Sequence, residues 1–123
     1  MLYVADSLNK RIAAIPNALT RTSTALAGRE VTSNGVINDP LGLTIAPNGH
    51  ILTANGNDGF IVETTPSGSQ IDSQLLDHTG TPPGGGCLFG LAVVPGGTGV
   101  YFVDDCTNTL NLLHKVCTFS NMG

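Results

Sequence analysis

The sequence predicts an all-β protein assembled from repeated four-stranded antiparallel sheets, and three observations lead to this fold class. Segments that end in Asp6, Asn55 and Asp104 resemble one another and recur with a spacing of 49 residues both times. A fixed period of about 20 to 50 residues is typical of stacked arrays and propellers. Within each period, short runs of alternating apolar residues indicate strands. The 16 glycines and 7 prolines suit the tight turns between them.

The strands can be placed copy by copy. Turn residues separate them: Asn48 and Gly49 tolerate the positive φ of a hairpin, and PGGTG at 95–99 is a looser turn of the same kind. From Gly42 to Gly90 the second and third copies match with an offset of 48 residues. We expect strands ending at Asp6, Asn55 and Asp104, and earlier strands through Leu43 and Ile45 and through Leu91 and Val93. Third strands are expected at about 11–15, 59–65 and 109–114, and weaker fourth strands near 23–27 and 70–76.

One stretch carries a competing pattern. Residues 7–19 place four aliphatic side chains on one face of a helix, with Ser7 available as an N-cap. Pro16 interrupts that pattern, and the equivalent stretch of the second copy is rich in β-branched residues and glycine. A strand is therefore favoured over a helix here.

Four antiparallel strands in a repeat of this length describe a propeller blade. We therefore expect one domain at 1–113, a partial β-propeller with copies at about 2–27, 40–76 and 88–113, and an unassigned tail at 114–123. About two and a half blades do not close a ring, which takes about four to eight. The expectation is a fragment of a larger propeller or, alternatively, an open structure that self-associates through its strand edges.

Composition argues against several partners. Charged residues make up only 11% of the chain and the net charge is -4, so binding to nucleic acid or to an anionic membrane is disfavoured. No apolar run approaches the roughly 20 residues of a membrane span. The N-terminal residues do not form a signal peptide.

Two stretches of the sequence resemble a known repeat family. The run DPLGLTIAPNGHILTANGNDGFIVETTPSG resembles an NHL repeat, and VADSLNKRIAAI at 4–15 matches the second half of the same pattern. The third copy departs from it at Thr109 and Leu110, where the family has Arg-Ile. The resemblance covers nearly the whole chain to about 113. It implies a six-bladed parent and, because such bacterial proteins are commonly exported, an extracellular or periplasmic location.

The resemblance also raises an enzymatic alternative. Related propellers include lactonases, streptogramin lyases and peptide-amidating lyases, whose metals are held by loops around the central channel. If Asp6, Asn55 and Asp104 face that channel together, they would suit calcium or another divalent metal. The favoured interpretation is that each caps its own turn, because Asp and Asn side chains bond backbone two residues on.

The remaining chemistry-bearing residues belong to no motif. His50, His78 and His114 lack metal-ligand spacing and are expected at the surface. TPPGGGC at 81–87 lacks the Lys-Ser/Thr ending of a phosphate loop and is expected to connect two blades. We therefore expect a non-catalytic scaffold that binds a protein, glycan or small molecule, with a fragment of a metal-dependent lactonase- or lyase-like enzyme as the alternative.

Two of the three cysteines can be paired by position. Cys87 and Cys106 lie at nearly equal distances on either side of the turn near Gly97, so they can stand opposite each other across a hairpin. A disulfide fits an exported protein, whereas two buried thiols fit a cytosolic one. Cys117 has no assigned partner.

Overall fold

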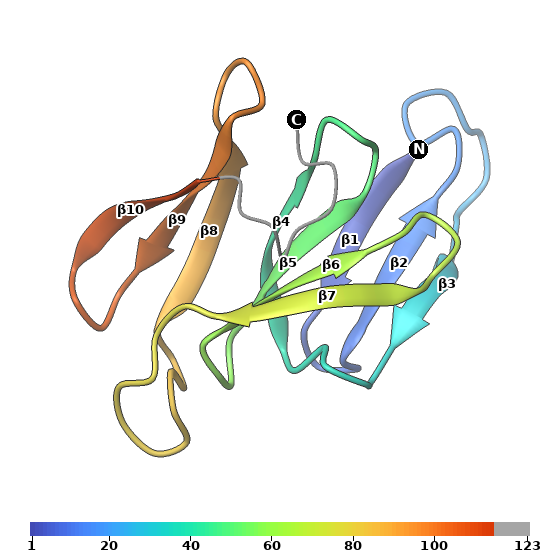
Figure 1. Ribbon diagram of the computed structural model, residues 1–123. Helices are drawn as coiled ribbons and strands as arrows, with labels where there is room; N and C mark the ends of the chain where they lie inside the picture. Colours follow the sequence, from blue (N-terminus) through green and yellow to red (C-terminus); the bar gives the residue numbers. More distant parts are fainter. Residues whose placement is uncertain (115–123) are drawn as a thin grey trace.

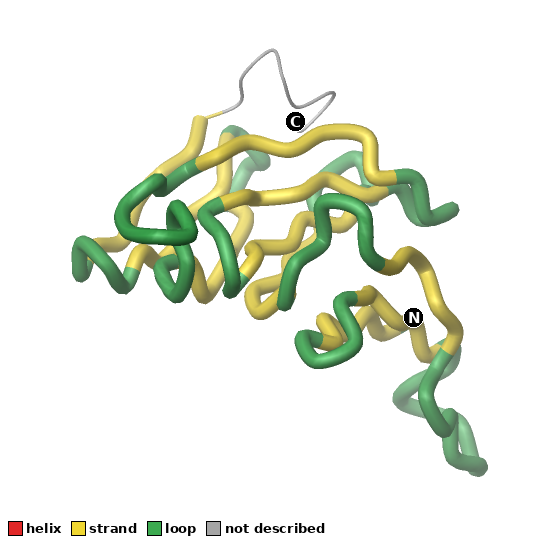
Figure 2. Tube along the Cα trace, turned by 90° about the horizontal axis from the view of Figure 1, so that it is seen from below, coloured by secondary structure: helices red, strands yellow, loops and turns green. Residues whose placement is uncertain are grey.

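The computed structural model describes residues 1–114, and within them the regular elements are all β-strands, which confirms the all-β class. Figure 1 shows three antiparallel sheets, and Figure 2 shows strands and loops with no helix. The N-terminal sheet contains β1 (Leu2–Asp6), β2 (Arg11–Ile15) and β3 (Arg29–Ser33); the middle sheet β4 (Pro40–Ile45), β5 (Ile51–Asn55), β6 (Phe60–Thr64) and β7 (Gln70–Leu75); the C-terminal sheet β8 (Leu88–Val93), β9 (Gly99–Asp104) and β10 (Thr109–His114).

The first and third copies resemble each other in sequence because they form the same kind of turn after Asp6 and Asp104. Asp6 pairs with Arg11 across β1 and β2, and Asp104 pairs with Thr109 across β9 and β10. The residue before the second strand of each pair has positive φ, 51° at Lys10 and 54° at Asn108. Both copies therefore close a four-residue loop whose last residue has a positive φ. The tail predicted at 114–123 lies outside the described residues except for His114, which ends β10.

The first copy forms neither the competing helix at 7–19 nor the strand expected near 23–27. The competing helix at 7–19 does not form, because residues 7–10 make a turn and β2 begins at Arg11. The strand expected near 23–27 is wrong: the third strand of this sheet is β3, which begins at Arg29. Leu26 is 87% exposed and has positive φ, so residues 23–27 offer no buried face. Val31 is the residue that supplies the apolar contact instead.

The middle sheet is buried on both faces, since successive side chains of a strand point to opposite sides. One face packs on the C-terminal sheet and the other on the N-terminal sheet, and β5 is buried throughout. The first cluster contains Ala46, Leu52, Ala54, Ile61, Leu88, Val100, Phe102 and Leu113. The second contains Ile12, Ala14, Val31, Ile37, Ile51 and Val62.

The sheets meet through their first strands. β4 contacts β8 on one side and β1 on the other. At Gly42 the approach is between backbones, because a Cβ placed there would lie only 1.9 Å from the carbonyl oxygen of Phe89. Glycine is the residue that leaves room for such an approach.

Candidate functional site

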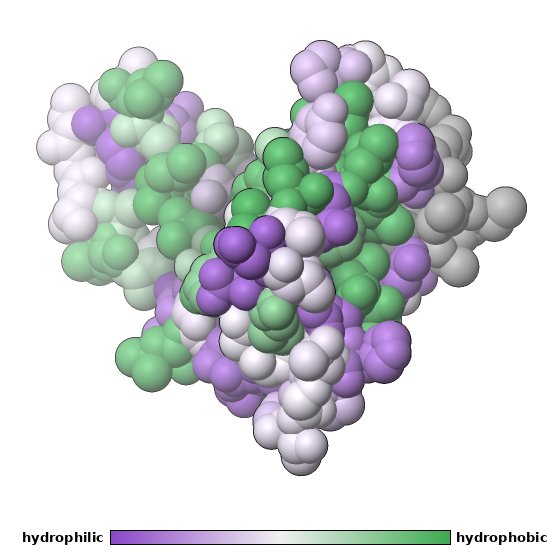
Figure 3. Space-filling model, turned by 90° about the vertical axis from the view of Figure 1, so that its left-hand side faces the viewer, coloured by the Kyte–Doolittle hydropathy of each residue, from purple (hydrophilic) through white to green (hydrophobic). Residues whose placement is uncertain are grey.

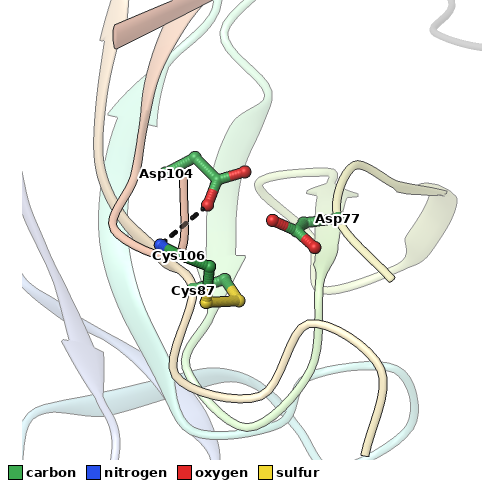
Figure 4. Close-up of side chains that lie close together, drawn as sticks. All are labelled: Asp77, Cys87, Asp104 and Cys106. Atoms are coloured by element: carbon green, nitrogen blue, oxygen red, sulfur yellow. Dashed lines mark hydrogen bonds between the residues drawn. A yellow bond between two sulfur atoms is a disulfide. The ribbon is translucent and has the colours of Figure 1, made fainter. Parts of the chain in front are cut away.

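Four side chains of metal-ligating type gather where the middle and C-terminal sheets meet (Figure 4). Their ligand atoms all lie within 4.8 Å of one another, and this is the group of that kind found among residues 1–114. Asp77 lies in the connection after β7, Cys87 directly before β8, Asp104 at the end of β9, and Cys106 in the turn that follows.

Glycines fix the connection that carries Asp77. A Cβ at Gly59 would lie 1.8 Å from the carbonyl oxygen of Asp77, and a Cβ at Gly84 would lie 2.2 Å from the same atom. Only glycine permits both approaches. The glycine-rich run at 81–87 is thus a link between two sheets, and it packs the backbone of Asp77 against the turn before β6.

Cys87 and Cys106 form a disulfide, the first of the two states that the sequence leaves open. Their Cα atoms are 4.9 Å apart, and the amide of Asp105 donates to the carbonyl of Cys87 at 2.7 Å. Cys87 is fully buried, whereas Cys106 is exposed in its turn. The bridge therefore ties the start of β8 to the β9–β10 turn, and it joins a buried residue to an exposed one.

Asp104 is a buried carboxyl, only 5% exposed, that caps this turn. Its Oδ1 accepts hydrogen bonds from the amides of Cys106 at 3.1 Å and Thr107 at 3.4 Å. Burial raises the pKa of Asp104, and the hydrogen bond and charge of the adjacent Asp77 raise it further. Both effects favour the neutral form of this carboxyl over the charged form.

Asp77 is equally buried, and its pKa moves the other way. Its Oδ1 accepts from the amide of Thr79 at 2.6 Å, and the hydrogen bonds from Thr79 lower the pKa of Asp77. Its Oδ2 is buried and finds no donor as long as both carboxyls are ionised. In Figure 4 the carboxyl of Asp77 faces that of Asp104. A proton held by Asp104 supplies the missing donor, so the two carboxyls titrate as a pair.

The residues predicted as a metal ring are engaged separately. Asp6 lies at the end of β1, where it accepts from Asn9 and forms an ion pair with Arg11, with 2.9 Å between Arg11 Nε and Asp6 Oδ2. The hydrogen bond from Arg11 is the largest cause that lowers the pKa of Asp6. Asp6 does not belong to the four-residue group beside the disulfide.

Asn55 is fully buried and uses both ends of its amide. Its Oδ1 accepts from the amide of Asn38 at 3.0 Å, and its Nδ2 donates to the carbonyl of Val36 at 2.8 Å and to Asp58 Oδ1 at 2.9 Å. Asn55 therefore holds the segment before β4 against the end of β5. Of the three residues singled out by the repeat, Asp104 is the one that joins the candidate site.

Sequence reasoning missed two residues. Asp77 was not singled out, although an Asp two residues before Thr79 is the pattern of a side chain that caps its own backbone. His50 was expected at the surface, but its Nδ1 lies 2.5 Å from Oε2 of Glu63, which is fully buried. His78 and His114 are exposed as expected.

Comparison with protein-family models and with curated proteins finds no match for this chain. Within residues 1–114 there is no helix of the length and apolar character that a membrane crossing needs. The fold and the site together define an all-β protein of three packed antiparallel sheets, with a pair of buried carboxyls beside a disulfide at one junction.

Proposed function

We propose that the chain is a segment of an NHL-type β-propeller that serves as a non-catalytic interaction scaffold in a larger exported protein. The observation that carries this proposal is an apolar face on the C-terminal sheet, here called the outer face: Tyr101, Val103, Leu110 and Leu112. Tyr101 pairs with Leu112 and Val103 with Leu110, so all four lie together on one side of the sheet. They are 36 to 69% exposed. Figure 3 looks onto this side of the molecule, where hydrophobic residues reach the surface.

Comparison of the outer face with the equivalent residues of the preceding copy supports a binding role for this face. One period earlier, Leu52, Ala54 and Ile61 occupy the positions of Tyr101, Val103 and Leu110, and all three are fully buried against the C-terminal sheet. The same positions in the chain thus face a neighbouring sheet in one copy and solvent in the next. Exposed contiguous apolar surface of this kind marks an interaction site.

Among the described residues, the backbone of β8 is also uncovered on the side away from β4. Gly42 lies against Phe89 of the next sheet, whereas at Gly90, the equivalent position, a Cβ would meet nothing closer than a side-chain carbon of Val103 at 3.7 Å. A further four-stranded sheet, seated on β8 as β8 is seated on β4, would fill this space and cover the outer face. Such successive seating of sheets is the construction of a propeller.

The buried carboxyl pair fits a structural role better than a catalytic one. Asp77 and Asp104 are both only 5% exposed, and both accept hydrogen bonds from backbone amides of their own turns. The disulfide beside them is compatible with an extracellular or periplasmic location. The binding partner would be a protein, a glycan or a small molecule held by loops of the complete assembly.

Sedimentation equilibrium over a range of concentrations tests the outer face. The wild-type chain is expected to show a mass above 12.6 kDa that rises with protein concentration, because association buries the apolar side chains of the outer face. Tyr101→Lys with Leu110→Lys should return the chain to a monomer. Leu8→Lys with Leu19→Lys is the matched control, since both leucines are exposed in loops. A wild-type chain that stays monomeric, or a Tyr101→Lys/Leu110→Lys variant that still associates, contradicts the proposal.

A further inference from the structure

We propose that reduction of the Cys87–Cys106 disulfide converts this junction into a zinc site, in which the two thiolates and the carboxylates of Asp77 and Asp104 bind one Zn²⁺. This inference is independent of the proposed scaffold role. It starts from the four-residue group in Figure 4, whose ligand atoms are already within 4.8 Å of one another.

The geometry asks for small movements. Tetrahedral zinc with bonds of about 2.3 Å to sulfur and 2.0–2.2 Å to oxygen places neighbouring ligand atoms roughly 3.4 to 3.8 Å apart. The carboxyls are held by capped turns, so the main change is the separation of the two sulfurs once their bond is broken. Rotation of the Cys106 side chain, which lies in an exposed turn, supplies that separation.

An independent observation points to a cation here. Asp77 is only 5% exposed, its Oδ2 has no hydrogen-bond donor, and its carboxyl faces that of Asp104. Two buried carboxylates with an unpartnered oxygen repel each other unless a proton or a metal ion lies between them. With the disulfide closed, the two carboxyls are the available metal ligands of the group. With the disulfide open, a divalent cation satisfies all four groups at once.

The reaction balances with a thiol reductant. A small dithiol attacks the sulfur of Cys106, which is the exposed residue of the pair. Cys87 leaves as a thiolate, and the second thiol of the reagent closes its own disulfide, so two electrons and two protons pass to the protein. Zinc then displaces the two thiol protons, together with any proton on the two carboxyls. The ligands carry four negative charges and the bound ion two positive ones.

Ligand type selects zinc over calcium. Thiolates are ligands for zinc and other softer metals, whereas calcium takes six to eight oxygen ligands. The zinc ion would join the same elements that the disulfide joins, namely the start of β8 and the β9–β10 turn, and would add the β7–β8 connection through Asp77. The disulfide and the metal are therefore two alternative cross-links of one junction, exchanged by redox state.

Zinc titration of the full chain in its two redox states tests this inference. In phosphine-reduced protein, competition with a chromophoric chelator should show one tightly bound Zn²⁺ per chain, and Co²⁺ in its place should give a thiolate charge-transfer absorption. The oxidised protein should bind zinc at least about tenfold more weakly, because it offers no thiolate. Zinc should also raise the melting temperature of the reduced chain, since a metal bound by the native state stabilises it.

Variants separate this site from adventitious thiol binding. Cys87→Ser and Cys106→Ser should each abolish the cobalt absorption or weaken zinc binding by about tenfold or more, while Cys117→Ser should leave both unchanged. Asp104→Asn retains the turn cap and is expected to fold, yet it should also weaken zinc binding at least about tenfold. The inference is overturned if reduced wild type binds no zinc, if Cys117→Ser alone removes binding, or if Asp77→Asn and Asp104→Asn both bind zinc as wild type does.

Discussion

Asp104 and Asp77 meet at the junction of two sheets with opposite protonation preferences: burial raises the pKa of Asp104, while hydrogen bonds from Thr79 lower the pKa of Asp77. The two residues are 27 positions apart in the sequence and belong to different turns. A proton on Asp104 would supply a donor for the buried Oδ2 of Asp77, and the two opposite pKa shifts make the stability of the chain depend on pH.

Asp104→Asn is expected to remove one part of the pH dependence of stability. An acid whose folded pKa is raised stabilises the fold below its ordinary value of 3.8, and this contribution is lost as pH rises through the raised pKa. Asn keeps the acceptor for the Cys106 amide and adds a permanent donor towards Asp77. Thermal unfolding of the oxidised chain should therefore show the variant at least as stable as wild type at pH 7, with its advantage shrinking as the pH is lowered.

Asp77→Asn should change the pH dependence of stability in the direction opposite to Asp104→Asn. A carboxyl whose folded pKa is depressed stabilises the fold above 3.8, and this contribution is lost as pH falls through the depressed pKa. The Asp6–Arg11 pair acts in the same direction in every variant and cancels in the difference from wild type. The difference in stability between wild type and the Asp104→Asn variant should change with pH. If this difference is the same at mildly acidic and at neutral pH, a proton shared by the two carboxyls does not cause the pH dependence.

Asn55→Ala is expected to destabilise the fold by roughly 2 kcal/mol or more, because it leaves the Asn38 amide and the Val36 carbonyl without their partners. Chemical denaturation at neutral pH measures this difference. Asn57→Ala is the matched control. Asn57 is exposed and its side chain donates one long hydrogen bond, at 3.4 Å, so the loss of this side chain should cost less than about 0.5 kcal/mol. Equal effects of the two substitutions would show that the buried amide has no special role.

Gly42→Ala and Gly90→Ala should differ although the two glycines occupy equivalent positions. A Cβ at Gly42 would lie 1.9 Å from the Phe89 carbonyl oxygen, so the two sheets must separate, at a cost of about 3 kcal/mol or complete loss of folding. A Cβ at Gly90 would make only an ordinary contact with the Val103 side chain, at 3.7 Å, so the effect of Gly90→Ala should stay below about 1 kcal/mol. Denaturant unfolding of both variants, at protein concentrations low enough that the chain is monomeric, measures the two effects. A severe effect of Gly90→Ala in the monomer would contradict the free space inferred beside Gly90.

Much of the local structure could be predicted from the sequence. The strands that flank the PNG and PGGTG turns, and the loops that begin at Asp6 and Asp104, follow from alternation and turn chemistry, which act between residues close in the chain. The misplaced strand at 23–27 shows the limit of this reasoning. Alternation there was weak, and whether Leu26 or Val31 is buried depended on where the middle sheet lies.

The candidate site could be predicted only in part. Position around one turn brought Cys87 and Cys106 together because the hairpin between them is a local structure. The repeat drew attention to Asp6, Asn55 and Asp104 as equivalents, yet their neighbours differ. Arg11 is the partner of Asp6, whereas Asn55 faces the Val36 carbonyl, which requires a donor that a carboxylate lacks.

The sequence by itself determined the period, the strands and the turns, because these depend on side-chain alternation and backbone preferences within a few residues. The tertiary structure alone decided which surfaces meet. It placed Asp77 beside Asp104 and buried Leu52 while leaving its equivalent Tyr101 exposed. Those outcomes depend on contacts between sheets, and neither the charge environment of a carboxyl nor the covering of an apolar face is encoded in the residues next to it in the chain.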